Sequence, residues 1–269
     1  MNNQKEAVLK FWDTASCGEE LYLKGGDEQE QFSNQMKIRY ELEPFIEAFA
    51  GFKESRKKKV LEIGVGLGAD HQRFAENGAI LYGCDLSARA VEKTRRRFNL
   101  LGLHSNLQVA DTENLPYQSA TFDLVYSYGV IHHTPNTEKA LLEIHRVLKP
   151  GGKARIMIYN KYSMLGFMLW TRYGLFRLRP FTSLYNVYDK YMESPGTKAY
   201  TTEEAKEMCK DFSEVNIEVK LSHADLLNSD AGQRHRGMIL TIAKKLYPRT
   251  LVKTLFKSNG LFMLISLTK

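Results

Sequence analysis

The stretch Val60–Ala69 constrains the fold of this chain more than any other part of the sequence. An apolar run typical of a strand, Val60–Ile63, leads into glycines at positions 64, 66 and 68, and a helical pattern begins at Ala69. Glycine backbones adopt positive φ and allow a ligand to approach the main chain closely. A glycine turn between strand and helix also directs the N–H groups of the helix N-terminus toward a bound group. The stretch therefore predicts a site for a nucleoside cofactor.

Two cofactor patterns fit this stretch equally well. Gly64, Gly66 and Ala69 match the dinucleotide pattern G-x-G-x-x-G/A. Gly64, Gly66 and Gly68 match the G-x-G-x-G loop of S-adenosylmethionine (SAM) enzymes. Asp85 lies 21 residues after Gly64, where an acid accepts both hydroxyls of a ribose, although it could also serve with Ser87 to cap a helix. Enzymes of both kinds use such an acid, so Asp85 does not distinguish between them.

Strand and helix patterns alternate regularly after residue 57. Strands are expected at 59–63, 80–84, 107–110, 122–127 and 153–159, and helices at 69–77, 87–101 and 137–148. Such alternation predicts a parallel sheet with helices on both faces. Ligands of these sheets bind beyond the carboxyl ends of the strands. Asp85, Asp111 and the segment from Ser127 to His133 all follow predicted strands, which makes them candidate site residues.

The first 56 residues have a different pattern from the rest of the chain. We expect a short helix at 4–13, a loop at 14–33, and an amphipathic helix at 35–52 that is interrupted at Pro44. Residues 1–56 are therefore expected to form an arm or lid, and residues 57–269 the core domain.

Composition excludes several classes of function. The net charge is +7, but the basic residues are scattered, and the clusters Arg56–Lys59 and Arg95–Arg97 are expected to be a solvated lead-in and an exposed helix face. A nucleic-acid partner is therefore disfavoured. Cys17, Cys84 and Cys209 form no C-x-x-C motif, and no metal-ligand motif is apparent. With no apolar leader and no run of about 20 apolar residues, the expected location is the cytoplasm.

Five ordered segments carry a family resemblance. These segments are Val60–Ala69, Asp85, Asp111–Tyr117, Phe122–His133 and Leu148–Gly152. Together they resemble the class I SAM-dependent methyltransferases, in particular the small-molecule branch that includes the ubiquinone and menaquinone C-methyltransferases. The resemblance implies an α/β, Rossmann-like doubly wound sheet of seven strands in the order 3-2-1-4-5-7-6. Its last strand would be antiparallel, and strands six and seven would lie at 215–221 and 261–267.

The resemblance also implies residue roles in binding SAM and its product S-adenosylhomocysteine. Glu62 would lie near the methionine ammonium, and the three glycines would line the methionine and ribose. The other implied contacts are Asp85 with the ribose, Leu86 with the adenine ring, Asp111 and Thr112 with the adenine edge, and Ser127 and Tyr128 with the methyl-bearing end. Val65 stands where many relatives have cysteine, at a position that is normally small or apolar.

Methyl transfer from a sulfonium needs no enzyme nucleophile and no metal. The protein must hold the acceptor in line with the S–CH3 bond, and for some acceptors it must supply a base. His132 and His133 follow the fourth predicted strand and are the candidate bases, with Tyr128 beside them. The alternative is that one or both histidines only pack or bond to the backbone.

The acceptor side of the site is expected in less typical segments. Residues 161–200, rich in aromatic side chains interleaved with arginines, are consistent with a substrate cap, a face that touches a membrane surface, or ordinary helical packing. Arginines around a histidine at 234–236 could hold a carboxylate, or could be exposed charges at a helix start. The candidate substrate residues are Tyr22, Tyr159, Asn160, His223, Arg234 and His235.

The function predicted from the sequence is SAM-dependent methyl transfer to a small organic acceptor, aromatic or anionic in character. An NAD(P)-dependent oxidoreductase is the first alternative, but it gives no role to Asp111 or to Phe122–His133. A catalytically inactive SAM-fold binding module is the second. The sequence does not define the accepting atom or the oligomeric state.

Overall fold

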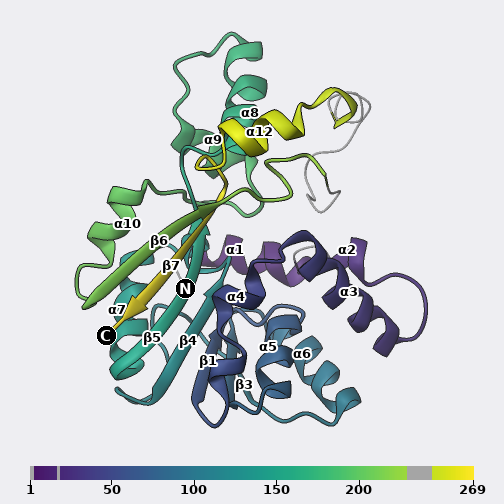
Figure 1. Ribbon diagram of the computed structural model, residues 1–269, viewed down its shortest axis with the longest axis vertical. Helices are drawn as coiled ribbons and strands as arrows, with labels where there is room; N and C mark the ends of the chain where they lie inside the picture. Colours follow the sequence, from purple (N-terminus) through teal and green to yellow (C-terminus); the bar gives the residue numbers. More distant parts are fainter. Residues whose placement is uncertain (1–2, 17–18, 229–243) are drawn as a thin grey trace.

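A computed structural model describes residues 3–16, 19–228 and 244–269, and its centre is a seven-stranded sheet (Figure 1). The strands are β1 (Lys59–Ile63), β2 (Ile80–Asp85), β3 (Asn106–Val109), β4 (Phe122–Tyr128), β5 (Leu148–Tyr159), β6 (Glu214–Lys220) and β7 (Phe262–Thr268). Their order is β3-β2-β1-β4-β5-β7-β6. β1 to β5 pair in parallel, whereas β7 is antiparallel to both β5 and β6. The predicted fold class and strand order are confirmed.

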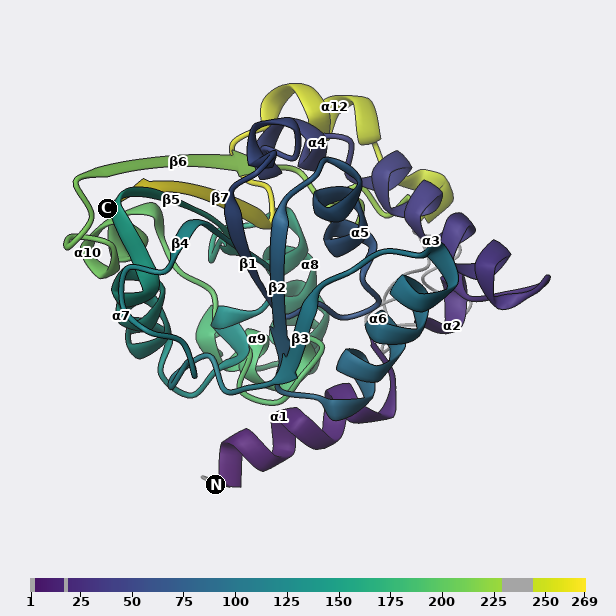
Figure 2. The same ribbon diagram turned by 90° about the horizontal axis from the view of Figure 1, so that it is seen from below.

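Helices cover both faces of the sheet, as the alternating pattern predicts (Figure 2). α5 (Ala69–Glu76) and α6 (Ala88–Leu101) lie on one face, and α7 (Thr137–Val147) and α10 (Thr202–Met208) lie on the other. Successive residues of a strand point to opposite faces. In β1, Leu61 packs in the cluster that contains α7, whereas Val60 packs in the cluster that contains α5 and α6. The central strands are therefore buried on both faces.

The arm before the sheet contains more helix than the sequence pattern predicts. It comprises α1 (Asn3–Thr14), α2 (Glu19–Tyr22), α3 (Glu28–Leu42) and α4 (Ile46–Ala50). The expected loop at 14–33 is wrong, because α2 and the start of α3 lie within it. Asp27 caps α3 by accepting a hydrogen bond from the Glu30 N–H at 2.9 Å. The expected interruption at Pro44 is confirmed, since α3 and α4 are separate helices on either side of it.

Arg97 corrects the expectation that Arg95–Arg97 form an exposed helix face. Arg95 and Arg96 are exposed, but the Arg97 side chain is fully buried. Its guanidinium donates to Oε1 of Gln72 at 2.7 Å, to Oε1 of Gln35 at 2.7 Å, and to the carbonyl oxygens of Leu67 and Phe32 at 2.9 and 3.1 Å. Arg97 thereby ties α3, α5 and the glycine loop to α6.

The segment between β5 and α10 forms a separate projection from the sheet. It contains α8 (Met164–Tyr173), a 3-10 turn η3 (Leu175–Arg177) and α9 (Leu184–Tyr191). The buried Tyr188 hydroxyl lies 2.7 Å from the Ser163 hydroxyl, which also caps α8. After β6 the described chain continues to residue 228, resumes at residue 244 and includes α12 (Arg249–Leu255). None of the helices described is both long enough and apolar enough to span a bilayer.

Candidate functional site

A cavity opens at the carboxyl ends of β1, β2 and β4, where the parallel strands were expected to hold a ligand. Most of the predicted cofactor residues line it: Glu62, Gly64, Gly66, Gly68, Asp85, Leu86, Asp111 and Thr112. Tyr128 and His133 line it as well, whereas Ser127 and His132 do not. α1 contributes Lys5, Val8 and Trp12, so the N-terminal arm forms part of the cavity wall.

The three glycines of the loop have distinct geometric reasons to be glycine. Their φ angles are 81° at Gly64, 52° at Gly66 and 77° at Gly68, all in the region that side chains disfavour. A Cβ on Gly64 would lie 2.2 Å from Cγ2 of Val130, so this position is also sterically closed. A Cβ on Gly66 would meet no atom within 4 Å. Gly66 thus exposes its main chain to the open space of the cavity.

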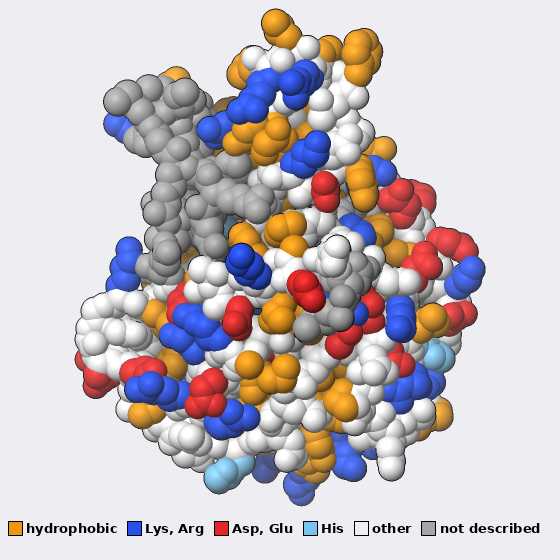
Figure 3. Space-filling view, turned by 180° about the vertical axis from the view of Figure 1, so that it is seen from behind, with side chains coloured by type: hydrophobic (Ala, Val, Ile, Leu, Met, Phe, Trp, Pro, Cys, Tyr) orange, Lys and Arg blue, Asp and Glu red, His pale blue; other side chains and the backbone are white. Residues whose placement is uncertain are grey.

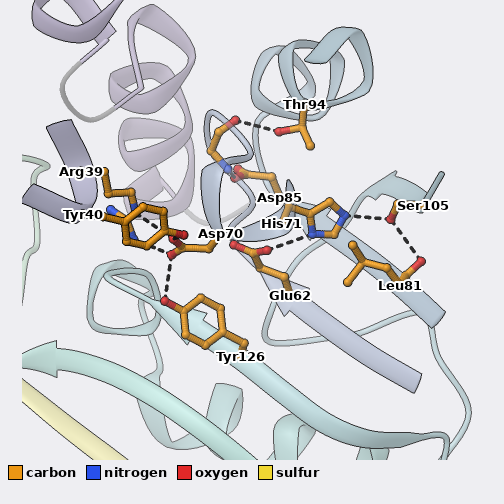
Figure 4. Close-up of polar contacts among 11 residues, drawn as sticks. Arg39, Tyr40, Glu62, Asp70, His71, Leu81, Asp85, Thr94, Ser105 and Tyr126 are labelled. Atoms are coloured by element: carbon orange, nitrogen blue, oxygen red, sulfur yellow. Dashed lines mark hydrogen bonds and ion pairs between the residues drawn. The ribbon is translucent and has the colours of Figure 1, made fainter. Parts of the chain in front are cut away.

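Asp85 lies at the cavity wall and accepts hydrogen bonds from the backbone on two sides. Its Oδ2 accepts a hydrogen bond from the Gly66 N–H at 3.1 Å (Figure 4). Its Oδ1 accepts one from the Ser87 N–H at 3.0 Å. Burial raises the pKa of this carboxyl, and the backbone donors only partly oppose that effect. The cap of α6 is Ser87, whose side chain accepts from the Ala90 N–H. Asp85 therefore joins the glycine loop to the start of α6 at the cavity wall.

Glu62 belongs to a hydrogen-bonded chain behind the loop. The Ser105 hydroxyl donates to the Leu81 carbonyl oxygen at 3.1 Å, so it can only accept from Nε2 of His71, 2.8 Å away. Nδ1 of His71 then carries no proton and accepts a hydrogen bond from the protonated Oε2 of Glu62, 2.9 Å away. Burial lowers the pKa of His71 to about 3 and raises that of Glu62 well above its ordinary value. Both pKa shifts favour the neutral carboxylic acid form of Glu62 beside a neutral His71.

Asp70 and Arg39 form a second buried polar group at the cavity, and the sequence reasoning missed both. Asp70 Oδ1 accepts from Nε of Arg39 at 2.9 Å, and Oδ2 accepts from Nη2 at 2.5 Å (Figure 4). The hydroxyls of Tyr40 and Tyr126 donate to the same carboxylate at 2.9 and 2.8 Å. Burial acts to raise the pKa of Asp70, but Arg39 and the hydroxyl donors outweigh it and hold the pKa low. The available sequence signal was an acid in the first turn after the glycine loop.

Asp111 lies at the opposite end of the cavity, in contact with α1. Nζ of Lys5 lies 2.5 Å from Oδ2 of Asp111 and 2.8 Å from Oε2 of Glu113. Asp111 also accepts the Glu113 N–H through Oδ1 at 2.9 Å, and Thr112 beside it is buried. The acid predicted to contact an adenine edge is thus paired with a lysine of the arm.

The two adjacent histidines have different surroundings. His133 Nδ1 lies 2.8 Å from Ser194 Oγ and 3.1 Å from Thr197 Oγ1. Because Thr197 donates its proton to the Ser194 carbonyl oxygen at 2.7 Å, it can only accept from His133. This arrangement favours the tautomer with the proton on Nδ1. Nε2 is an acceptor, and it has no hydrogen-bond partner among the described residues. Burial, with a smaller contribution from Lys198, lowers the pKa of His133 to about 3.

His132 is fully buried, with its ring 4.1 Å from that of Tyr159 and 4.2 Å from that of His133. Neither of its ring nitrogens has a hydrogen-bond partner within the described part of the chain. Because His132 does not line the cavity, its surroundings favour the packing alternative rather than a catalytic role.

The Tyr128 side chain is half-buried with its hydroxyl oxygen buried, and burial of the hydroxyl together with the adjacent Glu43 carboxylate raises its pKa. Ser127 is buried within β4 and away from the cavity.

The predicted substrate residues do not gather at the cavity. Tyr159 donates to Oε2 of Glu193 at 3.3 Å, and Asn160 donates to the Gly260 carbonyl oxygen at 2.9 Å. His223 Nε2 lies 3.6 Å from Oε1 of Glu43, and Tyr22 is half-buried in α2. None of these four lines the cavity, and neither does any residue of the segment 161–200. Arg234 and His235 lie outside the described residues.

Comparisons with known proteins agree with this geometry. Residues 61–156 match the family model described as a methyltransferase domain. A 95-residue stretch is 35% identical to sterol 4-C-methyltransferase strm-1 of Caenorhabditis elegans, covering 35% of this chain and 28% of that protein. A 123-residue stretch is 36% identical to phosphoethanolamine N-methyltransferase 2 of the same organism, covering 43% of this chain and 26% of that protein. The chain thus spans less than a third of either relative.

A solved structure extends the likeness in fold to nearly the whole chain. Geranyl diphosphate C-methyltransferase from Streptomyces coelicolor A3(2) superimposes with a TM-score of 0.64 at 12% identity, covering 99% of this chain and 98% of that one. Residues 61–156 therefore resemble a methyltransferase domain, and the strand order is the one that the resemblance to the class I SAM-dependent methyltransferases implies.

Proposed function

We propose that this protein transfers a methyl group from SAM to a small organic acceptor. The observation that carries the proposal is the cavity at the strand ends, where the open main chain of Gly66 meets the carboxyl groups of Glu62, Asp85 and Asp111. The oxygens of these groups can accept hydrogen bonds from the ammonium and hydroxyl groups of SAM, whereas a pyrophosphate carries negative charge and offers them no donor. The same arrangement disfavours the oxidoreductase alternative.

The described residues fit SAM in type and in place. Gly66 leaves room for a ligand directly against the backbone, because nothing lies within 4 Å of where its Cβ would be. Asp85 would hold the ribose, Glu62 the region of the methionine ammonium, and Asp111 with Thr112 the adenine edge. Leu86 would pack on the adenine ring. When bound, SAM supplies an activated methyl group, so the protein needs only to position the acceptor and exclude water.

His133 is the residue that we assign to the acceptor side. It lines the cavity, Ser194 and Thr197 fix its tautomer, and its Nε2 is left as a hydrogen-bond acceptor. An acceptor O–H or N–H that donates to Nε2 would be held in place for attack. Because burial keeps this imidazole a weak base, we assign it orientation of the nucleophile rather than full proton removal. Tyr128 forms the neighbouring wall of the cavity.

The relatives differ in the acceptor that their names give, a sterol carbon in one and phosphoethanolamine nitrogen in the other. We therefore propose a small organic acceptor without choosing its reacting atom. The arm formed by residues 1–56 would act as a lid, because α1 contributes Lys5 and Trp12 to the cavity wall. We retain the cytoplasm as the proposed location.

Calorimetry and product analysis test this function in two steps. SAM and NADH are titrated separately into the protein, and SAM alone is expected to bind. The protein is then incubated with methyl-labelled SAM and a cell extract, and S-adenosylhomocysteine and the labelled product are identified by mass spectrometry. Binding of NADH instead of SAM would overturn the cofactor assignment. SAM binding without S-adenosylhomocysteine in any extract would favour the inactive binding module.

A further inference from the structure

The projection formed by α8, η3 and α9 carries an unusually exposed group of large apolar side chains. Phe176, Leu178 and Phe181 expose 77%, 91% and 98% of their surface, and Leu175 beside them is also exposed. We call these four residues the apolar tip. They lie in η3 and the turn after it, in the projection that carries α8 at the top of Figure 1. Contiguous exposed apolar side chains of this kind mark interaction surfaces.

The backbone holds this exposed shape by specific contacts. The Gly174 carbonyl oxygen accepts the N–H groups of Arg177 at 3.2 Å and Arg179 at 2.8 Å. Leu178 between them has a positive φ of 57°, a conformation that is strained for a leucine. Nε1 of Trp170 donates to the Thr182 carbonyl oxygen at 2.9 Å and anchors the far side of the turn. The turn thus keeps Leu178 outward although burial would be the favourable state for a leucine.

Exposed arginines lie close to the tip. Between Lys161 and Tyr188 the sequence contains Arg172, Arg177 and Arg179 but no aspartate or glutamate. The guanidinium groups of Arg172 and Arg177 each lie 5.2 Å from the centre of the Tyr173 ring, which stacks at 3.8 Å on Tyr191. All three arginines are exposed, and none pairs with a carboxylate within the described residues. In Figure 3 the same end of the molecule shows orange side chains with blue ones directly beside them.

We propose that the apolar tip docks this protein on a lipid bilayer that contains anionic phospholipids. A convex group of phenylalanine and leucine side chains suits insertion into the boundary between headgroups and acyl chains. The unpaired arginines directly behind it would meet phosphate groups at headgroup depth. A protein partner would instead need a concave or flat surface of matched shape, and the three exposed arginines of this segment favour a strongly anionic surface. The inference does not depend on the proposed methyl transfer, because it rests on a part of the molecule away from the cavity.

Vesicle flotation with the full-length protein tests this inference. Vesicles of phosphatidylcholine with phosphatidylglycerol are compared with vesicles of phosphatidylcholine alone, and the wild-type protein is expected to float only with the former. The variant F176S/F181S removes two nearly fully exposed side chains, and we expect it to reduce the bound fraction about tenfold. The variant R172Q/R177Q/R179Q is expected to reduce binding to the anionic vesicles by about tenfold or more.

The control is Leu142→Ser, which removes a side chain that is 55% exposed on α7. It is expected to bind like the wild type. Light scattering after size-exclusion chromatography and SAM calorimetry accompany each variant, so that loss of docking is separated from loss of folding or of cofactor binding. Absence of wild-type flotation, or equal flotation of F176S/F181S, would overturn the inference. A wild-type dimer that F176S/F181S converts to a monomer would assign the tip to contact between copies of the chain instead.

Discussion

Nδ1 of His71 lies 2.9 Å from Oε2 of Glu62, directly behind the glycine loop, and the proton between them belongs to Glu62. The assignment follows from Ser105, whose own proton is used on the Leu81 carbonyl oxygen. It agrees with the lowered pKa of His71 and the raised pKa of Glu62, both of which result from burial. A pair of neutral groups avoids the cost of desolvating an ion pair inside the fold.

Glu62→Gln is expected to keep the fold and to remove a pH dependence. The glutamine amide can donate to His71 as the protonated acid does, but it cannot ionise. The pKa of Glu62 is raised in the folded protein above its ordinary value of 4.5, so its stabilising contribution is complete below pH 4.5 and is lost as the pH rises through the folded pKa. As the pH rises through that window, the free energy of unfolding of E62Q in urea should increase relative to that of the wild type by up to about 1.4 kcal/mol per pH unit. Parallel curves would mean that Glu62 is ionised in the fold.

Gly66→Ala separates cofactor binding from folding. The substitution places a Cβ in the open space of the cavity at a φ of 52°, with no clash against the protein. We expect a loss of stability of about 1–2 kcal/mol from the left-handed backbone. We also expect SAM affinity to fall about tenfold or more, equivalent to about 1.4 kcal/mol.

The matched control is Gly102→Ala, at the C-terminal end of α6 and away from the cavity. Its φ is 63°, and its Cβ would also meet nothing within 4 Å. It should lose similar stability and bind SAM like the wild type by calorimetry. Equal SAM affinities in the two variants would show that SAM does not bind against the main chain of Gly66.

Arg97→Met is expected to destabilise the protein by about 2–4 kcal/mol. The change keeps the apolar stem but leaves the Gln72 and Gln35 oxygens and the Leu67 carbonyl oxygen without their buried donor. Arg96→Met, one position earlier on α6, removes only an exposed ion pair with Glu28 and should cost less than about 1 kcal/mol. Urea unfolding of both variants measures the difference. Similar losses of unfolding free energy in the two variants would show that the buried hydrogen bonds of Arg97 stabilise the protein no more than the exposed ion pair of Arg96 does.

Local patterns of the chain were sufficient to predict the sheet but not the polar groups behind the site. The alternating parallel sheet, the glycine loop and Asp85 follow from spacing within about thirty residues and from the rule that ligands bind at strand ends, whereas the strand order came from the family resemblance. Arg97 and Arg39 could not be placed, because burial of an arginine depends on partners that arrive from α3 and α5, distant in sequence. The start of α3 was missed because its buried residues are only Phe32 and Gln35, too few apolar positions to give a helical pattern.

Acid should destabilise the protein well above the pH at which carboxylates titrate. Burial lowers the pKa of His71 and His133 to about 3, and that of His132 further, from an ordinary value of 6.5. Such groups stabilise the fold above pH 6.5, and this contribution is lost as the pH falls toward 3. Each buried histidine lowers the free energy of unfolding by up to about 1.4 kcal/mol for each pH unit of acidification. Glu62, whose pKa is raised, changes stability in the opposite direction and offsets the loss from one histidine only.

Unfolding in urea between pH 7 and pH 5 checks this loss, most cleanly in the E62Q background. The exposed His104 provides the control, because His104→Gln should leave the pH profile unchanged. A flat profile from pH 7 to pH 5 would show that the buried histidines take up protons in the folded protein as readily as in the unfolded chain.

His133→Ala tests whether this residue positions the acceptor or only packs. Removal of Nε2 takes away the one hydrogen-bond acceptor that His133 offers to the cavity. We expect kcat to fall about tenfold to a hundredfold while SAM affinity changes less than about threefold. Because the pKa of His133 is about 3, kcat should show no loss from its protonation between pH 6 and pH 8. His133→Gln, which keeps an acceptor group near the same place, should recover part of kcat. If His133→Ala weakens SAM binding as much as turnover, and His133→Gln restores neither, then His133 serves only to pack the turn against Ser194 and Thr197.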